Sequence, residues 1–124
     1  MDKPLLILIS GPYMTGTNGD ESAIAANLKA MEDYALPIFA KGHLAVVGEW
    51  LAWPVSRQAG GLSHSSEQFS NYQYPVAHRL LEMCDAVLRI PGESKGADLE
   101  MAKAKELGKV IFTSLDEIPN VILG

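Results

Sequence analysis

Short apolar runs alternate along this chain with longer stretches in which apolar residues recur every three or four positions. Residues 5–9 (Leu-Leu-Ile-Leu-Ile) are apolar throughout, which predicts a strand covered on both faces rather than an amphipathic strand. Further short strands are expected at 43–47, 84–90 and 110–112. The four runs therefore predict a parallel sheet of four to five strands.

Helical spacing fills the intervals between these runs. Apolar residues follow a helical period from residue 21 to about residue 41, where Pro37 is expected to kink or shorten the helix. A second helix is expected over 67–83, with Pro75 either opening it or breaking it in two. The polar stretch 56–66 is expected to be a mobile surface loop.

The C-terminal third continues the alternation. Residues 101–109 predict a helix that Gly108 ends, and residues 114–117 predict the cap and first turn of a short terminal helix. Strands alternating with helices predict an α/β, Rossmann-like or flavodoxin-like three-layer sandwich with a parallel sheet, forming one domain over 1–124. In such sheets ligands bind beyond the carboxyl ends of the strands, so the turns after the first and third strands should converge.

Composition narrows the classes of partner. The net charge of −5 with no basic patch argues against a nucleic-acid polymer as partner. The single cysteine, Cys84, excludes an intrachain disulfide, lies in an apolar run that predicts a buried thiol, and gives no support for a metal site. The N-terminal residues lack a signal-peptide pattern and the first apolar run is too short to span a membrane, so a cytoplasmic protein without a cofactor is expected.

The turn after the third predicted strand carries the strongest chemical signal. Ser94 and Gly96 offer a hydroxyl and bare backbone N–H groups to an anion, and Glu100 follows one helical turn further in. An alternative interpretation is that Asp98 and Glu100 only complement the helix dipole, which accounts well for Asp98 but not for the spacing of Ser94 and Gly96.

The turn after the first predicted strand is a second candidate. Gly11 allows a sharp exit from the strand, and Tyr13 could contact a sugar or a base. The segment is neither a Walker loop nor a dinucleotide-binding Gly-x-Gly-x-x-Gly motif, and a plain turn is the alternative. Trp50 could stack on a base whose edge Glu49 binds, although a tryptophan sealing a core or a subunit interface is the alternative.

These motifs carry a resemblance to a known group. Residues 11–16 (Gly-Pro-Tyr-Met-Thr-Gly), Cys84-Asp85, and residues 91–104 with Ser94, Gly96 and Glu100 resemble the nucleoside 2-deoxyribosyltransferase-like superfamily. Within it, the chain is most similar to small, largely uncharacterised bacterial and phage-type members. The resemblance covers most of the chain and is patchy between residues 53 and 74.

The resemblance implies roles for individual residues. Glu100 takes the place of a glutamate nucleophile that attacks the anomeric carbon of a nucleoside or nucleotide. Ser94 stands where members acting on free deoxynucleosides carry an aspartate, and it resembles the serine with which nucleoside monophosphate N-glycosidases hold the 5′-phosphate. The superfamily's usual aspartate in the preceding helix is replaced by Ala77, for which His78 or Asp98 would have to substitute.

The leading hypothesis is an enzyme, either an N-glycosyl hydrolase or a pentosyltransferase, that cleaves the N-glycosidic bond of a nucleoside 5′-monophosphate. Glu100 would be catalytic, and the expected substrate-binding residues are Gly11, Tyr13, Trp50, Ser94, Gly96 and Asp98. The alternatives are a non-catalytic nucleotide-binding module of the same fold and a flavodoxin-like structural or partner-binding domain. A homodimer or higher homo-oligomer is expected, with apolar surface offered by residues 50–53 and by Tyr72 and Tyr74.

Overall fold

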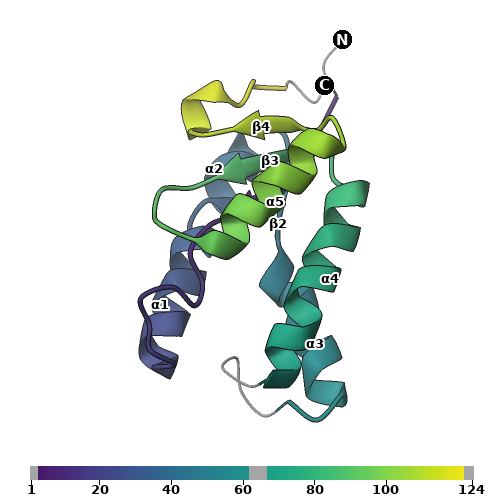
Figure 1. Cartoon of the computed structure of the whole chain (residues 1–124). Helices are drawn as coiled ribbons and strands as arrows, with labels where there is room; N and C mark the ends of the chain where they lie inside the picture. Colours follow the sequence, from purple (N-terminus) through teal and green to yellow (C-terminus); the bar gives the residue numbers. More distant parts are fainter. Residues whose placement is uncertain (1–2, 62–66, 122–124) are drawn as a thin grey trace.

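The computed structural model describes residues 3–61 and 67–121, and its centre is a parallel β-sheet (Figure 1). The four strands in this part of the chain follow the order β2-β1-β3-β4 and are β1 (Leu6–Ser10), β2 (Leu44–Val47), β3 (Ala86–Arg89) and β4 (Val110–Phe112). In the register of the sheet, Leu8 of β1 lies between Val46 and Val87. The predicted parallel sheet is confirmed.

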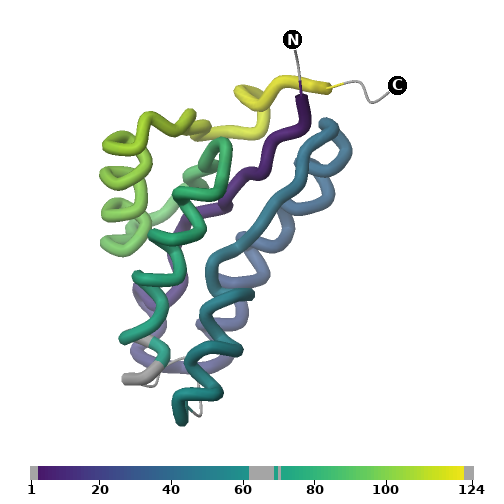
Figure 2. The backbone as a smooth tube through the Cα atoms, turned by 90° about the vertical axis from the view of Figure 1, so that its right-hand side faces the viewer, coloured from purple at the N-terminus to yellow at the C-terminus, as the bar shows by residue number. Residues whose placement is uncertain are grey.

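Helices cover both faces of the sheet (Figures 1 and 2). One face carries α1 (Glu21–Glu32) and α2 (Ala35–Ala40), and the other carries α4 (Glu67–Met83) and α5 (Lys95–Glu106). Alternate side chains of β1 point to opposite faces of the sheet. Ile7 and Ile9 pack in the core beneath α1 and α2, whereas Leu8 packs in the core beneath α4 and α5. The three-layer sandwich is confirmed.

The helix expected over 21–41 is shortened, as the presence of Pro37 indicates, because the segment is divided into α1 and α2. The backbone N–H of Asp33 closes α1 by donating to Lys29, and α2 begins two residues later. Pro37 has no N–H to donate, and its ring would clash with the carbonyl four residues earlier, at Asp33. Within α2 the same proline lies in the first turn, where the missing N–H costs nothing.

The region after β2 also differs from its prediction. Residues 56–58, expected in a loop, belong to α3 (Gly48–Gln58), while 62–66 lie outside the described residues. Helix α4 continues through Pro75 without a break. Helix α3 packs along α4, and both extend past the carboxyl edge of the sheet (Figure 2). This packing of two helices explains how each retains a proline in its interior.

The chain after β4 forms a single turn of 3-10 helix, η1 (Leu115–Glu117). Ser114 makes no side-chain capping bond there; instead the Glu117 carboxylate accepts hydrogen bonds from the backbone N–H and the hydroxyl of Thr113. A short terminal helical turn is therefore present, held by Glu117. Within the described ranges, no helix has the length and apolar character needed to cross a membrane.

Candidate active site

The turns that follow β1 and β3 meet at the carboxyl edge of the sheet. The backbone N–H of Ile90 donates to the carbonyl of Ser10 over 2.9 Å. A Cβ at Gly92, where φ is +120°, would lie 2.6 Å from Cγ of Pro12, so this close approach requires glycine. The strands on either side of β1 are reached by crossovers of opposite direction, which makes the β1/β3 boundary the topological switch point where ligands of such folds bind.

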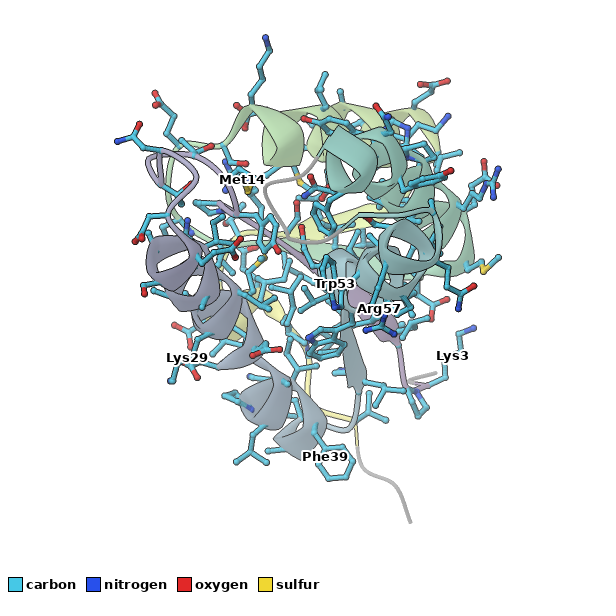
Figure 3. All side chains as sticks on the ribbon, turned by 90° about the horizontal axis from the view of Figure 1, so that it is seen from below. Lys3, Met14, Lys29, Phe39, Trp53 and Arg57 are labelled. Atoms are coloured by element: carbon cyan, nitrogen blue, oxygen red, sulfur yellow. The ribbon has the colours of Figure 1, made fainter. Side chains whose placement is uncertain are left out.

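A cavity of about 140 Å³ opens at this point. Five of the expected site residues line it together: Gly11, Tyr13, Ser94, Gly96 and Glu100. Its other walls come from the loop after β1, which includes Met14 (labelled in Figure 3), from the start of α3, and from α4. The prediction that the two turns converge on one site is therefore confirmed. We call this space the Glu100 cavity.

Two other expected site residues, Trp50 and Asp98, lie outside the Glu100 cavity. The indole N–H of Trp50 donates to Oε2 of Glu32 on α1, over 2.6 Å. The Asp98 side chain is 72% exposed and pairs with the Arg89 guanidinium at 3.2 Å. Because α5 turns by about 100° per residue, Asp98 and Glu100 point in widely different directions, and only Glu100 faces the cavity. Asp98 instead helps Arg89 hold the turn.

Glu100 is a partly buried carboxyl with a specific hydrogen-bond partner. Its Oε1 accepts a hydrogen bond from the Ser10 hydroxyl over 2.5 Å. Burial raises its pKa from 4.5 to about 7, and the charge of Glu49 adds to the rise, while the Ser10 hydrogen bond and the charge of Arg89 oppose it. A group with this pKa is ionised in a large fraction of molecules at neutral pH.

A second buried carboxyl, Glu49 at the start of α3, lines the same cavity. Its Oε2 accepts a hydrogen bond from the side-chain amide of Gln73 on α4, over 2.8 Å. Burial raises the pKa of Glu49, and the Gln73 hydrogen bond opposes that rise. The sequence pattern indicated Glu49 only as a partner for a base edge. It missed Gln73, because the packing of α3 on α4 sets which face of α4 points to the site.

The N-terminus of α5 forms another wall of the Glu100 cavity. Ser94 is buried and caps the helix, its Oγ accepting the N–H of Ala97 over 3.0 Å. The Ser94 hydroxyl hydrogen and the ammonium group of the adjacent Lys95 are available as further donors on this wall. A Cβ at Gly96 would lie 3.1 Å from the Tyr74 hydroxyl, so glycine keeps this wall close to α4. The arrangement suits an anion.

Position 77 offers no acid, as the sequence indicates. Ala77 is buried between α4 and α3, and a Cβ at Gly48 would lie 3.8 Å from its methyl group. His78 does not line the Glu100 cavity; its ring lies 6.3 Å from that of Tyr74, and its Nε2 has no hydrogen-bond partner among the described residues. His78 is therefore not placed to replace a missing aspartate directly.

The structure also bears on metal binding and on the thiol. The described part of the chain contains no group of three or more His, Cys, Asp or Glu side chains that could hold a metal ion. Cys84 is buried, as predicted, and burial together with the charge of Asp85 raises its pKa to about 11. A thiol with this pKa is protonated and unreactive at neutral pH.

Comparison with known proteins bears on the fold. No protein-family model matches the sequence, and the search of curated proteins finds no match. Among solved structures, the chain is similar to a 2-deoxyribosyltransferase from the psychrotolerant bacterium Bacillus psychrosaccharolyticus, with a TM-score of 0.57 and 15% sequence identity. The match covers 86% of this chain and 69% of that one. The chain thus shares the α/β fold of a 2-deoxyribosyltransferase.

Proposed function

We propose that this protein cleaves the N-glycosidic bond of a nucleoside 5′-monophosphate, with Glu100 as the nucleophile. The observation that carries the proposal is the placement of Glu100: a partly buried carboxyl at the switch point of the sheet, hydrogen-bonded by Ser10 and facing a cavity. The shared fold with a 2-deoxyribosyltransferase supports the choice of reaction. The pattern of Ser94, Gly96 and Glu100 supports it independently.

The chemistry follows from a carboxylate in a low-dielectric cavity. Cleavage of an N-glycosidic bond passes through an oxocarbenium-like transition state, which an adjacent negative charge stabilises. The Glu100 carboxylate would attack the anomeric carbon and form a glycosyl ester as the base departs. Water would then release the sugar phosphate, or an acceptor base would take up the sugar.

The wall formed by the N-terminus of α5 supports a phosphorylated substrate. The Ser94 hydroxyl, the Lys95 ammonium group and the first backbone N–H groups of α5 would bind the 5′-phosphate. The cavity is smaller than the roughly 300 Å³ at the lower end of small-molecule sites. We therefore expect it to enclose the sugar and the bond that breaks, with the rest of the nucleotide at its opening.

A homo-oligomer is part of the proposal. Trp50, Leu51 and Val55 on α3 and Tyr72 and Tyr74 on α4 are each between 37% and 45% exposed, which leaves apolar surface on the helix pair beside the site. Covering this surface with a second copy would remove it from water. Analytical ultracentrifugation at micromolar concentration should then give a mass above that of one chain, and a monomer would contradict this part of the proposal.

The function is tested by incubating the protein with a panel of nucleosides and nucleoside 5′-monophosphates and measuring free base by chromatography. We expect release from monophosphates, little release from nucleosides, and none with Glu100→Ala. Asp98→Ala is the matched control, since Asp98 lies on the same helix but outside the cavity. Nucleotide binding by calorimetry without base release would indicate the non-catalytic alternative, and full activity of Glu100→Ala would refute the assigned nucleophile.

A further inference from the structure

We propose that Glu49 donates the proton to the departing base, acting as the general acid that position 77 does not supply; this rests on the proposed function. Glu49, which is buried, and Glu100, which is partly buried, come from different elements, α3 and α5, and line one cavity. A pair of carboxyls with separate acid and nucleophile roles is what glycosidic bond cleavage requires.

The fold holds Glu49 at the cavity through two supports. The residue follows β2 directly and lies in the first turn of α3, which places it at the carboxyl edge of the sheet. The amide of Gln73 then fixes its Oε2 from α4. Gln73 lies one helical turn before Ala77, whose methyl group packs against Gly48. The face of α4 that carries no acid thus contacts the residue next to Glu49.

The reaction distinguishes the roles of the two carboxyls. Two like charges in one buried cavity oppose each other, so the pair retains one proton over a range of pH. Both charged forms have support, because the Ser10 hydroxyl and the charge of Arg89 lower the pKa of Glu100, while a backbone hydrogen bond and the Gln73 amide lower that of Glu49. The oxocarbenium-like transition state favours an ionised Glu100, so in the reactive form of the pair the proton lies on Glu49.

The proton balance closes over a full cycle. As the Glu100 oxygen forms its bond to the anomeric carbon, the electron pair of the C–N bond passes to the base, which takes the proton from Glu49. Glu49 is then a carboxylate and Glu100 a neutral ester, so the two charges never coincide. In the second half, the oxygen of a water molecule attacks the anomeric carbon while Glu49 takes a proton from that water. The ester bond to Glu100 then breaks and restores the Glu100 carboxylate.

The test separates proton donation from binding by varying the leaving group. Glu49→Gln keeps the shape and the acceptor for Gln73 but has no acidic proton. On an unmodified purine nucleoside 5′-monophosphate we expect kcat to fall by about 10²- to 10⁴-fold. On the N7-methyl analogue, whose cationic base leaves without a proton, the fall should stay below about tenfold; a 5-fluorinated base serves the same purpose for a pyrimidine substrate. Glu100→Gln, the matched control, should lose activity on both members of the pair.

The pH profile gives a second readout. Glu100, Lys95, Tyr13 and Tyr74 are the other titratable groups that line the cavity. Loss of the shared proton should produce an alkaline limb in kcat that Glu49→Gln abolishes. Gln73→Met removes the hydrogen bond that lowers the pKa of Glu49, so this limb should move to higher pH. That variant also keeps the proposal testable if Glu49→Gln does not fold.

The outcomes separate the two proposals. Three results would overturn the role of Glu49 while leaving Glu100 as the nucleophile. They are an equal loss of kcat by Glu49→Gln on both substrates, full activity of Glu49→Gln, and an alkaline limb that neither Glu49→Gln nor Gln73→Met moves. Absence of base release by the unmodified protein, or full activity of Glu100→Gln, would overturn the proposed function and the role of Glu49 with it.

Discussion

Two hollows lie at the carboxyl edge of the same sheet, and they differ in volume and in the residues that line them. The Glu100 cavity measures about 140 Å³, whereas a second hollow measures about 340 Å³. The second hollow, which we call the Thr113 groove, is lined by Tyr34, Leu88, Ile90, Pro91, Thr113, Ser114, Leu115 and Asp116. Its one acidic residue, Asp116, is exposed, while the smaller cavity holds one buried carboxyl, Glu49, and one partly buried carboxyl, Glu100.

The difference teaches that volume is a poor guide to a reactive site in this molecule. The Glu100 cavity lies where β1 and β3 adjoin, at the switch point, and two glycine-rich turns supply its donors. The Thr113 groove lies beyond the ends of β3 and β4, where the strand order continues without reversing, so no switch point occurs there. Carboxyls whose pKa burial raises cluster at functional sites in proteins, so the two carboxyls of the smaller cavity support the function proposed there.

The largest effect expected is on turnover. Glu100→Gln should lower kcat for nucleoside 5′-monophosphates by at least about 10³-fold, because an amide cannot form the glycosyl ester. Asp116→Asn, which changes an acid in the Thr113 groove, should leave kcat within about twofold. Base release followed by chromatography checks both. A larger loss in Asp116→Asn than in Glu100→Gln would reverse the assignment of the two hollows.

The next effect is on stability and its dependence on pH. Folding raises the pKa of Glu100 from 4.5 to about 7, so its contribution to stability is fully present below about pH 4.5 and is lost as pH rises through 7. Glu100→Gln should therefore stabilise the protein by up to about 3 kcal/mol at pH 8 and have little effect at pH 4. Urea denaturation at both pH values measures this.

Glu117 provides a control of opposite sign. Its hydrogen bonds from Thr113 lower its pKa, so its contribution is present above pH 4.5 and is lost as pH falls through its folded pKa. Glu117→Gln should thus destabilise at neutral pH, and the difference should shrink in acid. If the stability change had the same pH trend in both variants, burial of Glu100 would not be the cause of the pH dependence measured for Glu100→Gln.

A smaller effect concerns the anion wall. Ser94→Ala should raise KM for a nucleoside 5′-monophosphate about tenfold without changing KM for the nucleoside, because one hydrogen bond to phosphate is lost. It should also cost about 1 kcal/mol through loss of the helix cap. Asp20→Ala removes the equivalent cap of α1, where Asp20 accepts the N–H of Ala23, and should cost similar stability without changing KM. Equal KM changes in both variants would assign Ser94 to capping alone.

The smallest effect expected comes from Ser10. Its hydroxyl lowers the pKa of Glu100, so Ser10→Ala should move the acid limb of the kcat profile upward by roughly one pH unit. Activity rises through this limb because the nucleophile must be ionised. An unmoved limb would mean that a group other than Glu100 produces it.

The sequence by itself determined the layered fold and the position of the candidate site. The apolar runs of β1 and β3 indicated strands buried on both faces, which a parallel sheet between two helix layers provides. The cap residue Ser94 and the carboxyl Glu100 belong to one turn and the helix after it, so their spacing alone brought them to the same cavity. Both signals are local in the chain or periodic along it.

The tertiary structure alone decided the rest. The continuation of α4 through Pro75 and the helix that contains residues 56–58 depend on packing between elements, which outweighs local propensity. The same packing leaves Trp50 and Asp98 outside the cavity and brings Gln73 to Glu49 across 24 positions. Contacts between residues so far apart leave no pattern in a single sequence, and in this protein they set the second carboxyl of the site.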